Sequence, residues 1–328
     1  MNDLNTTSLL AILSLSQTIP KYLFSVGGPI LILVGTINSL FNVLVLEQKK
    51  LRKNPCSRCF VAFNIASFLL LYLSFLPTIL QIGYNIEPGA YNLPYCRIRV
   101  YLSFLLAILP PFYLILASVD RTLVTSASAQ VRKWSNRSTI RKCLFGITVF
   151  WVLFHIHALI YTDIIQVTTD TFVCFPKLGI YSVLVSYYTF VVHGVIPFVS
   201  LSIFAALTIR NLHHRPHHNM DASSLRTIHP SHRQDKQLIR MLFIEILTCV
   251  MFNFVFPGVF LYIETTQYQN KSHERDVVEH LLLSISIFIF YVPSCTSLYT
   301  NLIVSKSFRK RTKHIILRKL VNNRIRPD

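Results

Sequence analysis

Three residues with distinct chemistry lie at the two ends of one apolar segment. Cys96 precedes the segment and can form a covalent cross-link, and the charged residues Asp120 and Arg121 follow it. Arg121 comes 25 residues after Cys96, and the 20 residues 100–119 carry no formal charge. An arginine at the edge of such a segment needs a partner, because an unpaired charge there is costly, and Asp120 is adjacent. The pattern predicts a helix with a thiol at one end and an ion pair at the other.

Other ionisable residues are rare in the apolar part of the chain. Glu245 is the only formally charged residue inside any long apolar segment. An acid in that setting is a candidate functional group, and we expect it to interact with basic groups at the cytoplasmic ends of these segments. We see no Ser-His-Asp, metal-ligand or phosphate-loop pattern. We therefore expect a protein that is not an enzyme and that uses no metal or cofactor.

The elements that position these residues are long apolar helices. A helix needs roughly 20 residues to cross a bilayer. Seven segments meet this length: 22–46, 59–86, 100–119, 143–162, 178–209, 241–263 and 281–304. The segment 178–209 is too long for one upright span, so it should include part of an external loop or project into the cytoplasm. With 52% hydrophobic and 14% charged residues, the 328-residue chain is predicted to be an all-α membrane protein, a seven-transmembrane helix bundle.

The basic residues indicate how this bundle is oriented. Of the 32 Lys and Arg, 26 lie on one side of the predicted spans, which the positive-inside rule assigns to the cytoplasm. The N-terminus is then outside, in a multi-pass protein of the plasma membrane. The net charge of +18 is thus cytoplasmic and does not indicate nucleic-acid binding. The outer side holds eight acids and six basic residues, which favours a cationic peptide among possible ligands.

This topology divides the chain into three parts. Residues 1–21 form an extracellular tail, 22–304 the transmembrane domain, and 305–328 a cytoplasmic amphipathic helix and tail. The last part mixes apolar and basic residues, which predicts a short eighth helix on the anionic inner leaflet and makes membrane lipids partners. Glycosylation sequons at Asn5 and Asn270 both fall outside, where sugar can be added.

The cysteine and the Asp-Arg pair, 25 residues apart on the third of seven spans, resemble the third helix of rhodopsin-like (class A) G-protein-coupled receptors. Further similar positions lie in the first, fourth, fifth and sixth spans: Asn42, Trp151, Pro197 and Pro257.

The resemblance covers nearly the whole chain but is divergent. The motif reads Asp-Arg-Thr, and Ser67 and Val255 replace a family aspartate and tryptophan. The pattern is typical of the divergent orphan receptors that expand in invertebrate lineages.

The resemblance implies roles for residues at both ends of the third span. Cys96 should pair with Cys174, since these two of the seven cysteines fall outside, and the pair would hold an external loop over the bundle. Two unpaired thiols are the alternative. Arg121 should hold the resting bundle closed with Asp120 and an acid near the foot of the sixth span, for which Asp235 is the nearest candidate. A plain positive-inside anchor is the alternative for Arg121.

The resemblance also implies a ligand pocket among the outer halves of helices three, five, six and seven. Its candidate residues are Ser103, Phe104, His193, Tyr262 and Tyr291. Ser103 lies where amine receptors carry an aspartate, which disfavours an amine ligand. His193 is equally consistent with a structural hydrogen bond between helices.

We therefore expect a receptor that binds an extracellular ligand, a peptide or small molecule, and activates a heterotrimeric G protein through the cytoplasmic ends of helices three and six. The alternatives are a seven-span transporter and a non-signalling membrane scaffold. A transporter would carry midplane charges or paired broken helices, and in the sequence only Glu245 and a few histidines qualify.

Overall fold

A computed structural model describes most of the chain. It covers residues 16, 18–48, 51–52, 54–168, 171–177, 179–213, 225–304, 308–309 and 312–313; of these, the side chains of 167–168, 171, 225–237 and 304 are not described. Asn5, most of the predicted eighth helix and the side chain of Asp235 lie outside the described part.

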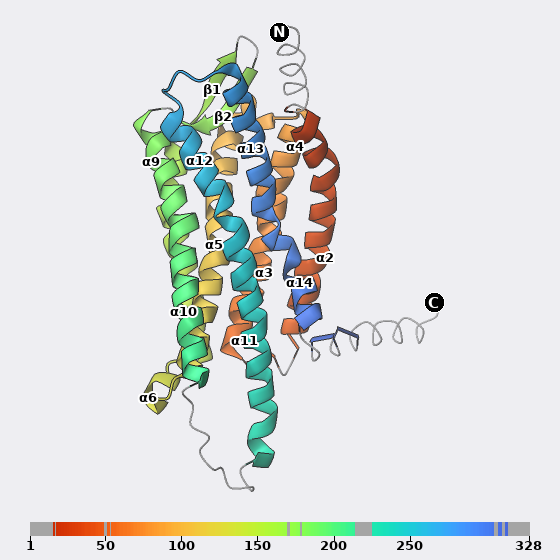
Figure 1. The fold of residues 1–328 in the computed structure, drawn as a ribbon, viewed down its shortest axis with the longest axis vertical. Helices are drawn as coiled ribbons and strands as arrows, with labels where there is room; N and C mark the ends of the chain where they lie inside the picture. The colour runs from red at the N-terminus through yellow and green to blue at the C-terminus, as the bar shows by residue number, and fades with distance from the viewer. Residues whose placement is uncertain are drawn as a thin grey trace, which may run out of the picture.

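Long apolar helical stretches dominate the fold (Figure 1). In the described residues, six stretches are long and apolar enough to cross a membrane: Thr18–Leu46, Pro55–Tyr84, Leu93–Thr125, Arg137–Ile160, Ile180–His213 and Leu238–Thr266. A further pair, His273–Tyr291 and Pro293–Ile303, meets the same test together but is bent by 44°. The chain is therefore an α-helical multi-pass membrane protein.

Several stretches consist of more than one element. The elements are η1 (Leu23–Gly27), α2 (Gly28–Leu46), α3 (Pro55–Leu70), η2 (Leu71–Phe75), α4 (Leu76–Tyr84), η3 (Pro88–Ala90), α5 (Leu93–Thr125), α6 (Ala129–Arg132), α7 (Arg137–Phe154), α8 (Ile156–Ile160), β1 (Thr162–Thr168), β2 (Thr171–Pro176), α9 (Ile180–Thr189), η4 (Phe190–Val195), α10 (Ile196–His213), α11 (Leu225–Asn253), α12 (Val255–Thr266), α13 (His273–Tyr291) and α14 (Pro293–Val304). Of the elements labelled η, η1, η2 and η4 are π-helical and η3 is a 3-10 helix. The stretch 180–213 is helical throughout, so a loop does not account for the length of the predicted fifth segment.

Polar side chains fix where several helices begin. Asn54, Asn92, Asn136 and Ser272 each accept a hydrogen bond from a backbone N–H in the first turn of the helix that follows. The first N–H groups of a helix have no partner within the helix, and such caps typically contribute about 1 kcal/mol. These caps mark the ends of α3, α5, α7 and α13 nearest the aqueous phase.

The bundle exposes apolar side chains and buries polar ones. On α2, large exposed side chains recur every three or four residues: Ile30, Leu33, Ile37, Leu40 and Leu44. This spacing makes a stripe along one face of the helix, which suits contact with lipid. On the opposite face, the buried Asn42 amide donates to Asn64 on α3 at 3.0 Å and to Ser297 on α14 at 2.6 Å. Asn42 thus joins three helices.

Helix α5 lies at the centre of the bundle. Its 33 residues span about 50 Å and continue through Pro110 and Pro111 without a break. It packs against α3, α7 and α10 along its length and against the strands at one end. Both ends of α5 therefore contact several other elements.

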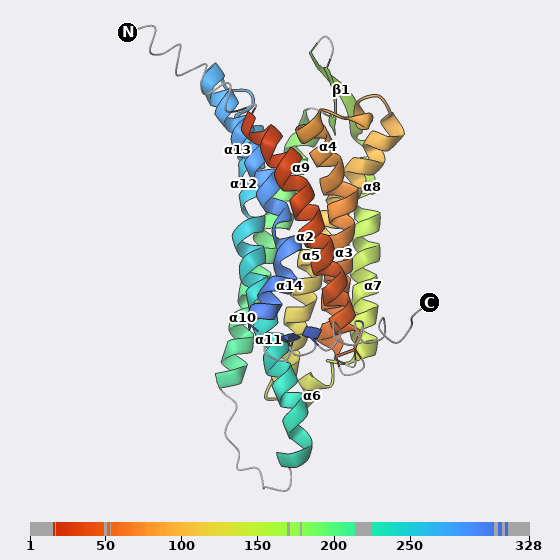
Figure 2. The same ribbon diagram turned by 90° about the vertical axis from the view of Figure 1, so that its right-hand side faces the viewer.

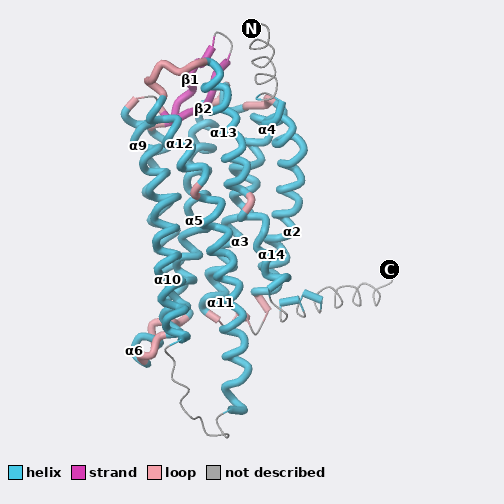
Figure 3. Tube along the Cα trace, in the orientation of Figure 1, coloured by secondary structure: helices cyan, strands magenta, loops and turns pink. Residues whose placement is uncertain are grey.

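A β-hairpin closes one end of the bundle. Strands β1 and β2 pair in antiparallel fashion, with Ile164 opposite Cys174. The described residues form no other strand (Figure 3). The hairpin lies at the end opposite α6 (Figures 1 and 2). The sequence predicts an external loop here; the ladder of backbone hydrogen bonds makes it a defined element.

Candidate functional site

The N-terminal end of α5 is fixed to the hairpin. Cys96 and Cys174 form a disulfide with a Cα–Cα distance of 5.6 Å. The neighbouring Arg97 donates from Nε to the Thr162 carbonyl at 3.1 Å. One covalent bond and one charge-assisted hydrogen bond thus hold the hairpin over this end of the bundle.

At the C-terminal end of α5, Arg121 and Asp120 form a buried ion pair. The guanidinium donates to Asp120 Oδ2 from Nη2 at 2.5 Å and from Nε at 3.1 Å, and the side chains are 1% and 0% exposed. Arg121 Nη2 also donates to Asn54 Oδ1 at 2.9 Å, and Ser135 Oγ donates to Asp120 Oδ1 at 2.5 Å. The cluster therefore joins α5 to the start of α3 and to the loop before α7.

Thr122, which stands where the family motif has a tyrosine, connects α5 to α10. Its hydroxyl lies 3.0 Å from the Thr208 hydroxyl and 3.2 Å from the Phe204 carbonyl oxygen. Asn211 donates to the Thr122 carbonyl at 3.2 Å. The Asp-Arg-Thr sequence thus contacts three neighbouring segments. The predicted second partner of Arg121, Asp235, lies in the part of α11 whose side chains are not described.

Two of the predicted pocket residues are joined by a chain of hydroxyls. Ser74 on η2 donates to Ser103 on α5 at 2.9 Å, and the Tyr291 hydroxyl lies 2.9 Å from Ser74. Ser103 and Tyr291 therefore share a site between the second, third and seventh helical stretches. Ser74, which connects the two, is not among the predicted pocket residues, because nothing in its apolar sequence context indicates a role in the pocket.

Phe104 and His193, two other predicted pocket residues, are connected through His155 and Tyr188, which were not among the predicted pocket residues. Phe104 stacks on His155 at a ring-centroid distance of 6.2 Å. His155 Nε2 lies 2.9 Å from the Tyr188 hydroxyl, and Tyr188 packs edge-on against His193 at 5.9 Å. His155 is buried and also contacts the Trp151 carbonyl at 2.8 Å through Nδ1, so it joins α5, α7 and α9.

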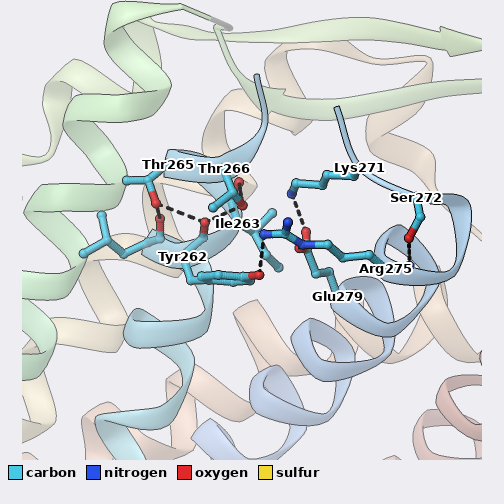
Figure 4. Close-up of polar contacts among 9 residues, drawn as sticks. Tyr262, Ile263, Thr265, Thr266, Lys271, Ser272, Arg275 and Glu279 are labelled. Atoms are coloured by element: carbon cyan, nitrogen blue, oxygen red, sulfur yellow. Dashed lines mark hydrogen bonds and ion pairs between the residues drawn. The ribbon is translucent and has the colours of Figure 1, made fainter. Parts of the chain in front are cut away.

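Tyr262 contacts a different set of residues, at the junction of α12 and α13 (Figure 4). Arg275 donates to its hydroxyl at 2.7 Å, and the guanidinium carbon lies 5.8 Å from the ring centroid. Arg275 also donates to Glu279 at 2.9 Å, and Lys271 pairs with the same carboxylate. The hydrogen bond and the cation–π contact of Tyr262 within the described residues thus do not involve the other four predicted pocket residues, and its place in a ligand pocket stays a prediction. Asn270 is exposed in the adjacent turn, where it is accessible for modification.

Glu245 is buried in the half of the bundle nearer α6. It is 2% exposed, and Thr300 on α14 donates to its Oε1 at 3.5 Å. Within the described part of the chain no basic group pairs with it, so its interaction with basic groups stays a prediction. A cavity of about 20 Å³ beside it, also lined by Cys249, Asn253 and Pro293, is large enough for one water molecule.

Comparison with known proteins adds no identification. No protein-family model matches the chain, and no curated protein is significantly similar to it. Its class must therefore be argued from the site itself.

Proposed function

We propose that the chain is a seven-span receptor of the plasma membrane, with its N-terminus outside, that activates a heterotrimeric G protein. The observation that carries the proposal is the buried Asp120–Arg121 cluster, on the central helix whose other end is bound to the hairpin by Cys96–Cys174. One helix then contacts both an external ligand site and the cytoplasmic surface. Counting the bent pair α13 and α14 as a single span gives the seven spans of this proposal.

The mechanism is a shift between two states. In the described state, the Arg121 guanidinium is held by Asp120 and Asn54 and is 1% exposed. A ligand that binds the outer half better in an open state would shift the equilibrium towards that state. Once the inner ends separate, the Arg121 donors become available to a helix of the Gα subunit that enters the groove.

The test is nucleotide exchange on a purified G protein, with the full chain in lipid nanodiscs. Arg121→Ala should reduce agonist-independent exchange to background. Arg132→Ala is the matched control, because Arg132 is exposed at the same end and binds only the carbonyls of Ser126 and Ala127 among the described residues. Exchange that survives Arg121→Ala, or that falls equally in both variants, would contradict the proposal.

A transporter is the second candidate, and one observation favours it. The sixth and seventh helical stretches are both interrupted, at Phe254 and Val292, and the buried Glu245 lies near these interruptions. Broken helices and an intramembrane acid are features of transporters. Uptake of a labelled solute into liposomes that depends on Glu245, without any G-protein exchange, would favour this candidate over the receptor.

A further inference from the structure

The outer part of α5 carries a largely buried cation whose hydrogen bonds are few. The Arg99 side chain is 12% exposed. Its Nη2 donates to Gln81 Oε1 on α4 at 2.6 Å, and its Nη1 lies 3.8 Å from Glu87 Oε1. A guanidinium has five N–H donors, and the hydrogen bond to Gln81 is the one formed with the described residues. Most of the Arg99 donors are therefore available to another acceptor.

The nearest acid does not complete this site. Glu87 Oε1 is buried and accepts no hydrogen bond from the described residues. The 3.8 Å separation from Arg99 exceeds the roughly 2.7–2.9 Å of a charge-assisted hydrogen bond. Buried charges need close, well-oriented partners to offset the loss of water. Glu87 thus balances the charge of Arg99 without supplying its hydrogen bonds.

A second donor lies one helical turn from Arg99. Each hydroxyl has a single proton, and that of Ser74 goes to Ser103. The Tyr291 hydroxyl must then be the donor to Ser74, which leaves the Ser103 proton without an acceptor among the described residues. Arg99 and Ser103 are four residues apart on α5 and so lie on one face of the helix.

The charge and surroundings of these donors define what they can bind. A single guanidinium beside a single hydroxyl donor matches a monoanion with two oxygen acceptors, which is a carboxylate. Phe75 stacks on Tyr291 at 4.3 Å, and Phe288 packs against Phe75 at 6.0 Å. These largely buried rings make the surroundings of the donors apolar and aromatic.

We propose that Arg99 and Ser103 bind the carboxylate of an extracellular ligand, which replaces Glu87 at the guanidinium. The inference deepens the proposed function by naming the chemical class of the ligand, and it rests on that proposal only for which side of the membrane is outside. It replaces the expectation of a cationic peptide, because that expectation counted surface charges and this site is a partly buried one.

Two probes that differ only in charge test the site on the purified full-length chain. N-acetylphenylalanine carries an aromatic ring and a carboxylate, and N-acetylphenylalaninamide is its neutral counterpart. Titration calorimetry in nanodiscs should detect binding of the acid and not of the amide. Arg99→Gln should weaken binding of the acid at least about tenfold, because a charge-assisted pair is lost. The matched control is Arg97→Gln, two residues away, since Arg97 binds the hairpin backbone instead.

A gain-of-binding variant keeps the test decisive if Arg99→Gln folds poorly. Glu87→Gln removes the competing negative charge and should tighten binding of the acid several-fold, whereas Ser103→Ala should weaken it. Equal binding of acid and amide, or weaker binding in Glu87→Gln, would overturn the inference. Inorganic phosphate binding more tightly than the acid would also overturn it, in favour of a phosphate site.

The result of this binding test can be distinguished from the result of the nucleotide-exchange test. The titration contains no G protein, so a chain that fails to activate one can still bind the acid. Conversely, a chain that binds acid and amide equally can still lose exchange in Arg121→Ala, which would overturn the carboxylate site and leave the receptor proposal standing.

Discussion

Arg121 is buried because its solvation by water is replaced by protein oxygens. One Asp120 oxygen accepts two of its hydrogen bonds, and Asn54 accepts another. The sequence predicts the pairing with Asp120, because the two residues are adjacent and the apolar segment ends there. It does not predict Asn54, which lies far from Arg121 along the chain, or Ser135, which belongs to a loop. Both residues approach the ion pair only through tertiary packing.

Removing the charge of Asp120 should release Arg121. Asp120→Asn keeps the shape of the side chain but breaks a buried ion pair, a change that typically costs about 3–5 kcal/mol. We expect basal nucleotide exchange to rise several-fold and the melting temperature to fall. Asp163→Asn is the control, because that carboxylate is 43% exposed and lies 3.9 Å from Lys177 at the other end of the bundle. Unchanged exchange in Asp120→Asn would mean that the pair does not restrain Arg121.

At the scale of elements, the apolar segments predict the long helices well because each segment must satisfy its own backbone hydrogen bonds in lipid. The hairpin and the interruptions at Phe254 and Val292 could not be predicted in the same way. The hairpin depends on pairing between strands. Pro257 and Pro293 lie close to the two interruptions, but Pro110 and Pro111 leave α5 unbroken, so a proline in the sequence indicates only that a break is possible.

The link between the hairpin and α5 predicts equal effects of its two cysteines. Cys96→Ser and Cys174→Ser should reduce surface expression to the same extent, and the double variant should be no worse than either one. Disulfides typically contribute about 2–4 kcal/mol. Cys143→Ser, at a half-buried cysteine outside the disulfide, should express normally. Unequal effects of the two single variants would show that loss of the disulfide does not explain the reduced surface expression.

Close packing between η1 and α4 predicts that Gly83 is intolerant of a side chain. A Cβ atom there would lie 2.9 Å from the Ser25 nitrogen and 3.1 Å from the Phe24 carbonyl carbon, which are backbone atoms that cannot easily move. Gly83→Ala should destabilise the protein by about 1–3 kcal/mol. Gly146→Ala is the control: no atom lies within 4 Å, so the better helix propensity of alanine should stabilise α7 by up to about 1 kcal/mol. Thermal unfolding in detergent measures the stability of both variants. Equal melting temperatures for Gly83→Ala and Gly146→Ala would contradict the close packing at Gly83.

At the scale of the whole molecule, two interruptions lie at one level of the bundle. The cavity beside Glu245 is lined by Asn253, next to the α11–α12 break, and by Pro293, next to the α13–α14 bend. On the side of the hairpin, Arg275 joins Tyr262 on α12 to Glu279 on α13 (Figure 4). Segments α12 and α13 are thus connected to each other on one side of a level at which α11 and α14, on the other side, can change direction.

The separation of α11 from the inner end of α5 tests the receptor proposal most directly. Spin labels at Lys133, in the turn after α6, and Arg240, on α11, occupy exposed positions at that end. Their distance should increase by several ångströms when the chain in nanodiscs binds a nucleotide-free G protein, and Arg121→Ala should abolish the increase. An unchanged distance in the presence of the G protein, or an equal increase in Arg121→Ala, would contradict the account.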